Sequence, residues 1–468
     1  MENVKTMGTE IKTPSLVYRF LRLFTDIRQG EALTALLLML NVFFLLTAYY
    51  ILKPIREALM LEKWTPEAKS YMGVAQAFIL IFLVKIFSRL ASKVPRQILI
   101  TRVILFFISN LILFYLLHGF GVSGKALAMI FFIWVGIFNV MVIAQFWAFA
   151  NDIYTLEAGK RLFPIVAFGA TFGGYIGSEL TKRLAKSQSV YQMMLVAAAI
   201  LGICILFTFI VHKREVGLKK KLALKTGESR QEQIVRIDAE KPVEKGGGFR
   251  LLGKSRYLLL IAFFVLLLNF VNTNGQYILD NVVVPAAKKA AAAAAVQGPQ
   301  LEQFKQQFIA KFFADFNAIM NLWAMFVQLF LVSRIFKWFG VRVAMFFLPL
   351  IALSGYSAIS LGASLVLVKW VKALENGSDY SIMNTSRHAL FLITTREEKY
   401  KAKAAIDTFF QRTGDTLSAL LVFLNVTFLS FRIETLSFIN AASVLIWIFV
   451  GILIFKTHKK LTATKAAA

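Results

Sequence analysis

Residues 31–52 read EALTALLLMLNVFFLLTAYYIL, an apolar run whose one charged side chain, Glu31, stands at its first position. The hydrocarbon core of a bilayer is about 30 Å thick, and a helix rising about 1.5 Å per residue needs about 20 apolar residues to cross it. The stretch therefore predicts a membrane-spanning helix. It lacks the alternation of apolar and polar positions that a barrel strand requires.

The same pattern recurs along the chain, which has twelve apolar stretches long enough to cross a bilayer. They lie at 31–52, 70–91, 97–118, 124–150, 162–184, 190–211, 256–279, 306–336, 341–362, 364–393, 404–430 and 434–455. Hydrophobic residues make up 58% of the 468 positions and charged residues only 17%, against about a quarter in soluble proteins. We predict an all-α membrane protein with twelve transmembrane helices, because helices satisfy their backbone hydrogen bonds within lipid.

The excess of basic residues is predicted to be a topology signal. Lys and Arg number 53 against 26 Asp and Glu, which gives a net charge of +27. The basic residues concentrate in the N-terminal segment, in the even-numbered connections between the stretches and at the C-terminus, so the positive-inside rule places both termini in the cytoplasm. With the charge explained in this way, no nucleic-acid partner is expected.

The long connection at 213–254 is predicted to be a basic cytoplasmic linker, flexible around its run of glycines. It divides the chain into an amphipathic cytoplasmic lead-in at 1–30, a six-helix bundle at 31–212, a second six-helix bundle at 255–456 and a cytoplasmic tail at 457–468. Two six-helix bundles joined by a long cytoplasmic loop are typical of the major facilitator architecture.

Small residues suggest how two of the stretches pack. Gly169, Gly173 and Gly177 recur every fourth residue, a spacing that lets membrane helices approach closely. In a weak internal similarity with an offset of 241 residues, Gly173 corresponds to Gly414. The Ala-rich segment 285–295 is predicted to be a surface loop or a short helix.

Polar side chains inside the apolar stretches are the candidates for function, because a charge at the bilayer centre costs about 2.5–3.5 kcal/mol or more. They form three stripes with helical spacing. The stripes are Lys369, Lys372, Asn376, Tyr380, Asn384 and Arg387 in the tenth stretch, Asn269, Asn272, Gln276 and Asp280 in the seventh, and Asp407, Gln411 and Asp415 in the eleventh.

Two interpretations of these polar residues remain open. The stripes could join helices through hydrogen bonds, and Lys403 with Asp407 and Lys311 with Asp315 could form pairs four residues apart. In the segment LKPIREAL, at 52–59, Pro54 is expected to disturb the helix, and the basic residues beside it either extend to the membrane surface or bind substrate.

The substrate interpretation predicts a cationic cavity that collects Arg56 from the first bundle and Arg387 from the second. A guanidinium group offers a planar fork of donors suited to phosphate or carboxylate, so an organic anion is the expected cargo. The sequence contains no phosphate loop, no paired His ligands and no nucleophile elbow. We therefore expect neither an enzyme nor a metal site.

Several segments resemble the nucleotide transporter family that includes the ATP/ADP translocases of plastids and obligate intracellular bacteria. They are FWAFAND at 146–152, EAGKRLFPIVAFGA at 157–170, NFVNTNGQYIL at 269–279, LKPIREAL, and above all SDYSIMNTSRHALFLITTREEKYKAKAAIDTFF at 378–410. The resemblance implies a carrier that exchanges ATP for ADP or imports nucleotides, and this sequence is closer to a free-living bacterial branch. Arg56 and Arg387 match substrate-binding lysines of the exchangers, whereas two of their glutamates correspond to the region of Val135 and to Asn272.

Together these observations predict a nucleotide transporter that works by alternating access in a bacterial inner membrane, without a cofactor or an obligatory protein partner. The substrate-binding residues are predicted to be Arg56, Arg387, Lys53, Lys369, Lys372, Asn272, Gln276, Tyr380 and Asn384, and the candidates for proton coupling are Asp407 and Asp415. The alternatives are a symporter of another phosphorylated or carboxylated anion and, from a different class, a non-transporting membrane receptor or scaffold.

Overall fold

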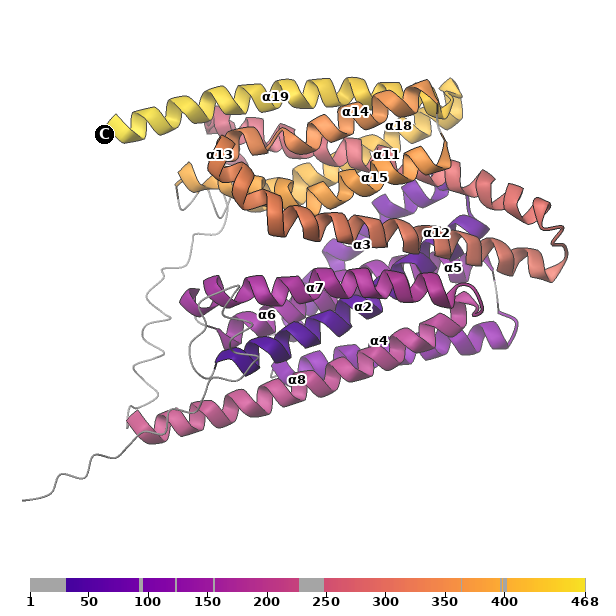
Figure 1. Ribbon diagram of the computed structural model, residues 1–468, viewed down its shortest axis with the longest axis horizontal. Coiled ribbons are helices and arrows are strands. Elements are labelled where there is room, and N and C mark those ends of the chain that lie inside the picture. The colour runs from indigo at the N-terminus through magenta and orange to yellow at the C-terminus, as the bar shows by residue number, and fades with distance from the viewer. Residues whose placement is uncertain are drawn as a thin grey trace, which may run out of the picture.

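The computed structural model describes residues 31–91, 96–122, 124–154, 156–226, 248–362, 364–395, 398 and 402–467. Helices account for nearly all of them, and these residues contain no strand. The long helices run roughly along one direction and form two groups, with α2 and α4–α8 in the lower half of Figure 1, α11–α19 in the upper half and α3 between them.

In the first group, as far as the structure describes it, the opening helix is followed by five further helical segments. Its helices are α2 (Glu31–Lys63), α3 (Pro66–Ala91), α4 (Arg96–Gly119), α5 (Lys125–Phe138), α6 (Ala144–Ile153), α7 (Leu156–Leu184) and α8 (Val190–Thr226). A π-helical turn over Asn139–Ile143 joins α5 to α6, so that these two form one continuous segment.

The second group repeats this course with more interruptions. Its helices are α10 (Gly248–Lys254), α11 (Arg256–Ala293), α12 (Pro299–Phe326), α13 (Val332–Ala344), α14 (Phe347–Leu361), α15 (Leu365–Ser378), α16 (Asn384–Leu390), α17 (Lys403–Ala405), α18 (Gln411–Leu424) and α19 (Ile433–Ala467). Four π-helical turns, at Val327–Leu331, Asp379–Met383, Ile406–Phe410 and Asn425–Leu429, lie within or at the ends of these segments.

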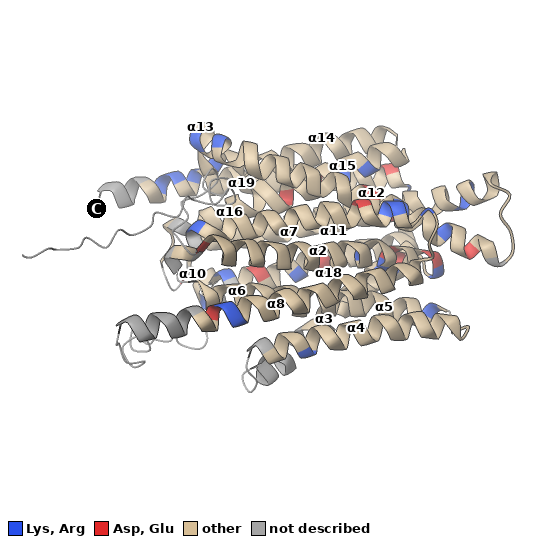
Figure 2. Cartoon of the chain, turned by 60° about the horizontal axis from the view of Figure 1, so that its bottom comes forward, with Lys and Arg blue, Asp and Glu red and all other residues tan. Residues whose placement is uncertain are grey.

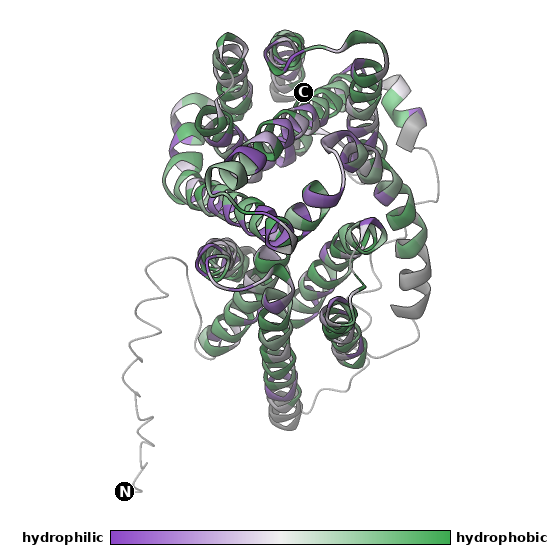
Figure 3. Ribbon diagram, turned by 90° about the vertical axis from the view of Figure 1, so that its right-hand side faces the viewer, coloured by the Kyte–Doolittle hydropathy of each residue, from purple (hydrophilic) through white to green (hydrophobic). Residues whose placement is uncertain are grey.

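The protein is a multi-pass integral membrane protein. Seven of the described helical segments are long and apolar enough to cross a bilayer. These are Glu31–Lys63, Ile98–Gly119, Lys125–Ile153, Val190–Gly217, Arg256–Ala293, Gln300–Ala344 and Ile433–Thr462. Large apolar side chains such as Phe78, Phe106 and Phe449 are exposed on the outer helices, as expected of a surface that faces lipid. Figure 3 shows these helices mostly in the colour of hydrophobic residues, and Figure 2 shows Lys and Arg gathered mainly toward helix ends.

Each of the twelve predicted stretches is mostly helical over its described part, with a turn at Met345 and Phe346 inside the ninth, although twelve crossings stay a prediction. The tenth stretch shows why hydropathy alone is insufficient: Lys369, Lys372, Glu375 and Asp379 all fall within α15 and the turn that follows it. The lead-in at 1–30 and residues 227–247 of the linker lie outside the described residues.

Several boundaries differ from those predicted by apolarity. The start of the linker is helical, because α8 continues to Thr226, and its end forms α10. The Ala-rich segment extends α11 to Ala293, and the tail extends α19. Alanine and lysine both favour helix, so these helices continue beyond the apolar residues that would lie in the bilayer.

The glycine spacing predicted close packing, and the structure confirms it. A Cβ added at Gly169, Gly173 or Gly177 would overlap the backbone carbonyl of Met39, Phe43 or Thr47 on α2. The two backbones therefore touch along three turns of α7. Pro54 does not end α2, although it leaves the carbonyl of Tyr50 without its usual amide donor. The Thr181 hydroxyl of α7 lies 3.5 Å from that carbonyl, but this hydroxyl is nearer to the Gly177 carbonyl, at 2.8 Å.

The second group repeats this packing. A Cβ added at Gly414 of α18 would overlap the Leu266 carbonyl of α11. A Cβ added at Gly173 would overlap α2 in the same way in the first group. Helix α2 packs against α7 and α8, and α11 packs against α18 and α19. The two groups meet where α12 packs against α7 and α2, and where α18 packs against α3.

The contact between α2 and α7 predicts a sharp dependence on glycine. Gly173→Ala is expected to destabilise the protein by about 1–3 kcal/mol, because the new methyl group must push the α2 backbone away. Thermal unfolding of the purified protein in detergent measures the effect. Gly202→Ala on α8 is the matched control, since nothing lies within 4 Å of an added Cβ there. An equal shift in both variants would contradict the packing argument.

Candidate functional site

Two cavities lie between the helix groups, and the side chain of Tyr380 contributes to the walls of both. The larger has a volume of about 990 Å³ and the smaller about 250 Å³. Pockets that hold drug-sized ligands usually have volumes of about 300–1,000 Å³. Both cavities take residues from α2, α12 and the segment that contains α15 and α16, so they combine the two groups.

The smaller cavity is cationic. Lys53 and Arg56 of α2 and Lys69 of α3 line it together with Glu57. Arg56 donates from Nε to Glu57 Oε1 at 3.0 Å and also from Nη2 to the same oxygen, and its guanidinium stacks on Phe132 at 5.0 Å from the ring centre. Lys69 Nζ lies 2.5 Å from Glu57 Oε2, so Glu57 is held by two cations.

Lys69 also joins the two groups, because its ammonium lies 2.7 Å from Asp280 Oδ2 and 2.9 Å from Asp280 Oδ1 on α11. Both side chains are almost completely buried, with Lys69 7% exposed and Asp280 1% exposed. Gln276 Nε2 donates to Asp280 Oδ1 at 2.9 Å. Removing one member of such a buried pair would leave an uncompensated charge.

Lys53 has no carboxylate partner within the part of the chain that the structure describes. Its ammonium lies 5.3 Å from the centre of the Tyr50 ring, a cation–π contact that compensates only part of the lost hydration. The cluster therefore contains three cations, Lys53, Arg56 and Lys69, against the two carboxylates of Glu57 and Asp280. An anion entering the cavity would balance the excess positive charge.

Unpaired amides add to the polar wall of the smaller cavity. Asn317 is completely buried, yet neither its Oδ1 nor its Nδ2 has a hydrogen-bond partner in the described structure, and Asn376 Oδ1 also lacks one. Both residues line the cavity. Buried polar groups are almost always paired, so these atoms are suited to a ligand or to bound water.

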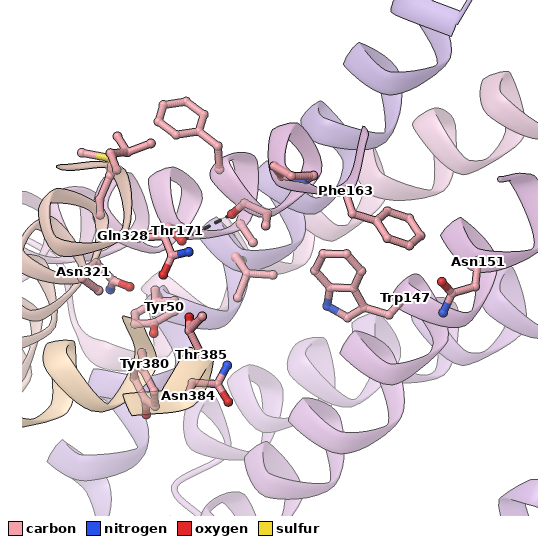
Figure 4. Close-up of a pocket in the computed structure, with 18 of the residues that line it drawn as sticks. Tyr50, Trp147, Asn151, Phe163, Thr171, Asn321, Gln328, Tyr380, Asn384 and Thr385 are labelled. Atoms are coloured by element: carbon pink, nitrogen blue, oxygen red, sulfur yellow. Dashed lines mark hydrogen bonds between the residues drawn. The ribbon is translucent and has the colours of Figure 1, made fainter. Parts of the chain in front are cut away.

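The larger cavity has a different chemistry, with aromatic rings and neutral amides. Figure 4 shows Trp147 and Phe163 on one side, and Tyr50, Tyr380, Asn384 and Thr385 across from them. The rings of Trp147 and Phe163 meet edge to face, with centroids 6.0 Å apart. Aromatic faces stack on flat ring systems, and side-chain amides both donate and accept hydrogen bonds. The cavity thus suits an uncharged, partly aromatic group.

The predicted polar stripe of the tenth stretch is divided by a π-helical turn over Asp379–Met383, which contains Tyr380. Such a turn adds a residue and rotates the following side chains by about 100° relative to a regular helix. Tyr380 and Asn384 line the larger cavity, whereas Lys369, Lys372 and Arg387 do not line either cavity. The expectation of one continuous stripe is wrong, because Lys369 and Lys372 bind groups on α12 and α11 and the turn separates Arg387 from the residues before it.

The structure places the three basic residues of that stripe in different surroundings. Lys369 lies 2.6 Å from Asp315 Oδ2 on α12. Lys372 is completely buried and donates to the side-chain oxygen of Asn272 at 2.6 Å, to its carbonyl at 3.0 Å and to Glu375 at 3.0 Å. Arg387 is half-buried and has no ion pair within the described residues.

The two amides predicted on α11 do line the smaller cavity. Asn272 uses its oxygen to accept from Lys372, which leaves its NH₂ group as the free part of the carboxamide. Gln276 instead donates to Asp280. Since Lys372 fixes the direction of the Asn272 side chain from behind the wall, it acts on the cavity indirectly.

The coupling candidates lie apart from the cavities. Asp407 forms the predicted pair with Lys403, at 3.3 Å. Asp415 accepts from Arg412 at 3.1 Å and from the Thr273 hydroxyl at 2.7 Å, and Thr273 lines the smaller cavity. Asp415 is therefore one hydrogen bond away from the cavity.

The pair predicted between Lys311 and Asp315 is wrong. Asp315 instead lies 2.8 Å from Lys182 of α7 and 2.6 Å from Lys369 of α15. Contact with two cations from other helices leaves its oxygens occupied, so the neighbouring turn of its own helix does not supply the partner.

Sequence analysis missed Lys69, Asn317, Trp147 and Asn321 as parts of the site. Lys69 lies one residue before the predicted start of the second stretch, so it did not stand out as a charged residue within an apolar stretch. Asn317 and Asn321 are four residues apart on α12, as in the recognised stripes, so their spacing was a usable signal. Within the described residues, no three His, Cys, Asp or Glu side chains cluster as a metal would require.

Comparison with known proteins identifies a family that matches most of the chain. Residues 126–459 match the family model described as TLC ATP/ADP transporter. ADP,ATP carrier protein 5 of Rickettsia conorii is 24% identical over 330 residues, which cover 62% of this chain and 60% of that protein. ADP,ATP carrier protein 1 of Chlamydia pneumoniae is 20% identical over 310 residues, 60% of this chain and 57% of that protein. The matched region thus spans about three fifths of these relatives.

Solved structures show the same type of fold. The crystal structure of the nucleoside transporter NupG aligns with a TM-score of 0.62 at 12% identity, covering 90% of this chain and 99% of that one. A POT family transporter in complex with 5-aminolevulinic acid aligns with a TM-score of 0.57 at 14% identity, covering 92% and 96%. At such low identity the likeness concerns the major-facilitator-type fold alone.

Because Lys372 is buried and paired with Glu375, we predict that it stabilises the folded protein. Lys372→Met is expected to destabilise the protein by about 3–5 kcal/mol, because it leaves Glu375 buried without its cation. Thermal unfolding in detergent should show the loss. The double variant Lys372→Met/Glu375→Gln removes both charges and should recover much of the stability. If the single variant unfolds at the same temperature as the parent, the buried pair is not a stabilising element.

Proposed function

Since the chain belongs to the TLC ATP/ADP transporter family, we propose that it carries nucleotides across a membrane by alternating access. The observation that carries this proposal is the excess cation of the smaller cavity, where Lys53 has no carboxylate partner among the described residues and lies beside Arg56. A carrier of anions needs such a charge, because its substrate must supply the missing counter-ion within a buried site.

The two joined cavities suggest how a nucleotide would bind. The phosphate groups would lie against Lys53 and Arg56, whose donors form charge-assisted hydrogen bonds to phosphate oxygens. The base would stack in the larger cavity near Trp147 and Phe163, and Asn384 would select it by hydrogen bonding. Tyr380 would contact the sugar, because it belongs to both walls.

The transport cycle we propose uses twelve spans in two six-helix bundles with both termini in the cytoplasm. In that topology the larger cavity lies toward the cytoplasm, and the ion pairs beyond Lys69 close the opposite side. The relatives named above come from Rickettsia and Chlamydia, which supports a bacterial inner membrane as the location. Rocking of one bundle against the other would expose the same site to each side in turn.

Exchange of ATP for ADP is the first form of this activity to test, with import of other nucleotides as the second. An exchange of ATP for ADP moves one net charge per cycle, so a membrane potential biases it by about 2.3 kcal/mol per 100 mV. A symporter of another phosphorylated or carboxylated anion would use the same cations. That alternative predicts uptake without dependence on the adenine base.

Uptake into proteoliposomes preloaded with unlabelled ATP, ADP, other nucleoside phosphates or phosphate tests the proposal directly. Lys53→Gln and Arg56→Gln are each expected to weaken ATP binding roughly ten- to hundredfold, since a hydrogen bond to a charged group contributes about 1.5–3 kcal/mol. Arg387→Gln tests the one predicted arginine that does not line the cavities.

Arg342→Gln is the matched control, because Arg342 also stacks on an aromatic ring, Phe455, but lines neither cavity. It should transport as the parent does. Unchanged ATP uptake in both Lys53→Gln and Arg56→Gln would remove these residues from the site and, with them, the basis of the proposal.

Proton coupling, if present, is proposed to involve Asp415 through Thr273. Asp415→Asn should then abolish the dependence of uptake on a pH gradient while nucleotide binding is retained, because Asn still accepts the Thr273 hydrogen bond but cannot release a proton. Uptake is measured with and without an imposed gradient. Asp407→Asn is the comparison, and a loss of coupling in that variant alone would assign the role to Asp407 instead.

A further inference from the structure

The ion pair between Lys69 and Asp280 joins the two helix groups at the wall of the smaller cavity. Lys69 lines that cavity, whereas Asp280, on the other helix group, does not. Further contacts between the groups lie beyond this pair, toward the connections after α2 and α7. They include Tyr277 with Glu67 at 2.9 Å, Lys63 with Glu302 at 2.7 Å, Lys182 with Asp315 at 2.8 Å, and Gln307 with the Gln188 carbonyl at 3.0 Å. These contacts close one end of the space between the groups.

Lys69 is in contact with both carboxylates. Its ammonium donates to Asp280 Oδ1 at 2.9 Å and to Asp280 Oδ2 at 2.7 Å, and it forms an ion pair with Glu57 Oε2 at 2.5 Å. Any anion that binds Lys69 from the cavity must therefore displace one of the two carboxylates. The identity of the displaced carboxylate decides what happens to the contact between the helix groups.

Asp280 is the carboxylate in contact with one cation, whereas Glu57 contacts two. Glu57 accepts two hydrogen bonds from Arg56 in addition to its contact with Lys69, so two cations hold it. Asp280 is held by Lys69 and by the neutral amide of Gln276. Glu57 also belongs to the same helix group as Lys69, so its displacement would leave the groups joined, whereas displacement of Asp280 would separate α3 from α11.

We propose that Asp280 takes the place of a substrate anion at Lys69, and that a polyphosphate entering the smaller cavity replaces it and releases the closed end. This inference rests on the proposed function and adds its gating step. Lys69 becomes a third phosphate ligand together with Lys53 and Arg56. The empty carrier stays closed at this end, because only an anion in the cavity can compensate Lys69 when Asp280 leaves.

A cysteine at position 178 reports on this end of the molecule. Ser178 is completely buried and lies on the face of α7 that also carries Gly174, which approaches Asn321 of α12, and Lys182, which pairs with Asp315 of α12. Cys204 is the one cysteine of the chain and is buried. Ser178→Cys in a Cys204→Ser background therefore gives a single thiol between the two groups.

The experiment measures the rate at which a maleimide labels this thiol in the full-length protein in nanodiscs. ATP and inorganic triphosphate should each accelerate labelling by about fivefold or more, the lower end of typical couplings between sites, while adenosine should not. With Asp280→Asn added, labelling should be fast without any ligand, and ATP should no longer change it.

The matched control is Glu434→Gln, which removes a carboxylate that pairs with Arg432 of its own segment and lines neither cavity. Its labelling should still accelerate with ATP. If Asp280→Asn alone proves unstable, Lys69→Gln/Asp280→Asn removes both charges and leaves no unpaired ion, and it should also label rapidly without ligand.

The outcomes separate this inference from the proposed function. Slow labelling of Asp280→Asn without ligand, or labelling of that variant that ATP still accelerates, would overturn the gating step even if ATP is transported. Acceleration of the parent by inorganic triphosphate but not by ATP would support the gating step and contradict nucleotide transport. A parent whose labelling neither ATP nor triphosphate accelerates would overturn the gating step.

Discussion

Buried positive charge between two helix groups is the constraint on which the rest of the site depends. Lys53, Arg56 and Lys69 occupy one small cavity, and two carboxylates, Glu57 and Asp280, compensate them. The remaining charge cannot be hydrated as it would be in water, so the cavity favours an anion. Because one carboxylate belongs to each helix group, the same balance of charge also sets how the groups are joined.

Close helix packing keeps these charges in position. The glycines of α7 let it touch α2, which stays continuous through Pro54 and past Lys53 and Arg56. The second group repeats the arrangement with Gly414 of α18 against α11, the helix that carries Asn272, Gln276 and Asp280. Two similar frameworks thus present different side chains to one shared space.

Within that space the chemistry changes from one end to the other. The small cavity holds the charged groups, and the large one offers Trp147, Phe163 and neutral amides. Tyr380 connects them because a π-helical turn displaces it from the regular course of its helix. Lys372, eight residues before Tyr380, lines neither cavity and instead donates to Asn272.

The sequence by itself determined the all-α membrane class, the helical course of the apolar stretches and the close approach at Gly173, because each follows from local composition or from spacing along one helix. Only the tertiary structure decided which charges meet. Lys69 and Asp280 are 211 residues apart, and Asp315 selects Lys182 and Lys369 over Lys311 on its own helix. The spacing of residues along a chain specifies the face of a helix, whereas ion pairs between helices depend on how the helices are arranged in space and on which buried charges lack a partner.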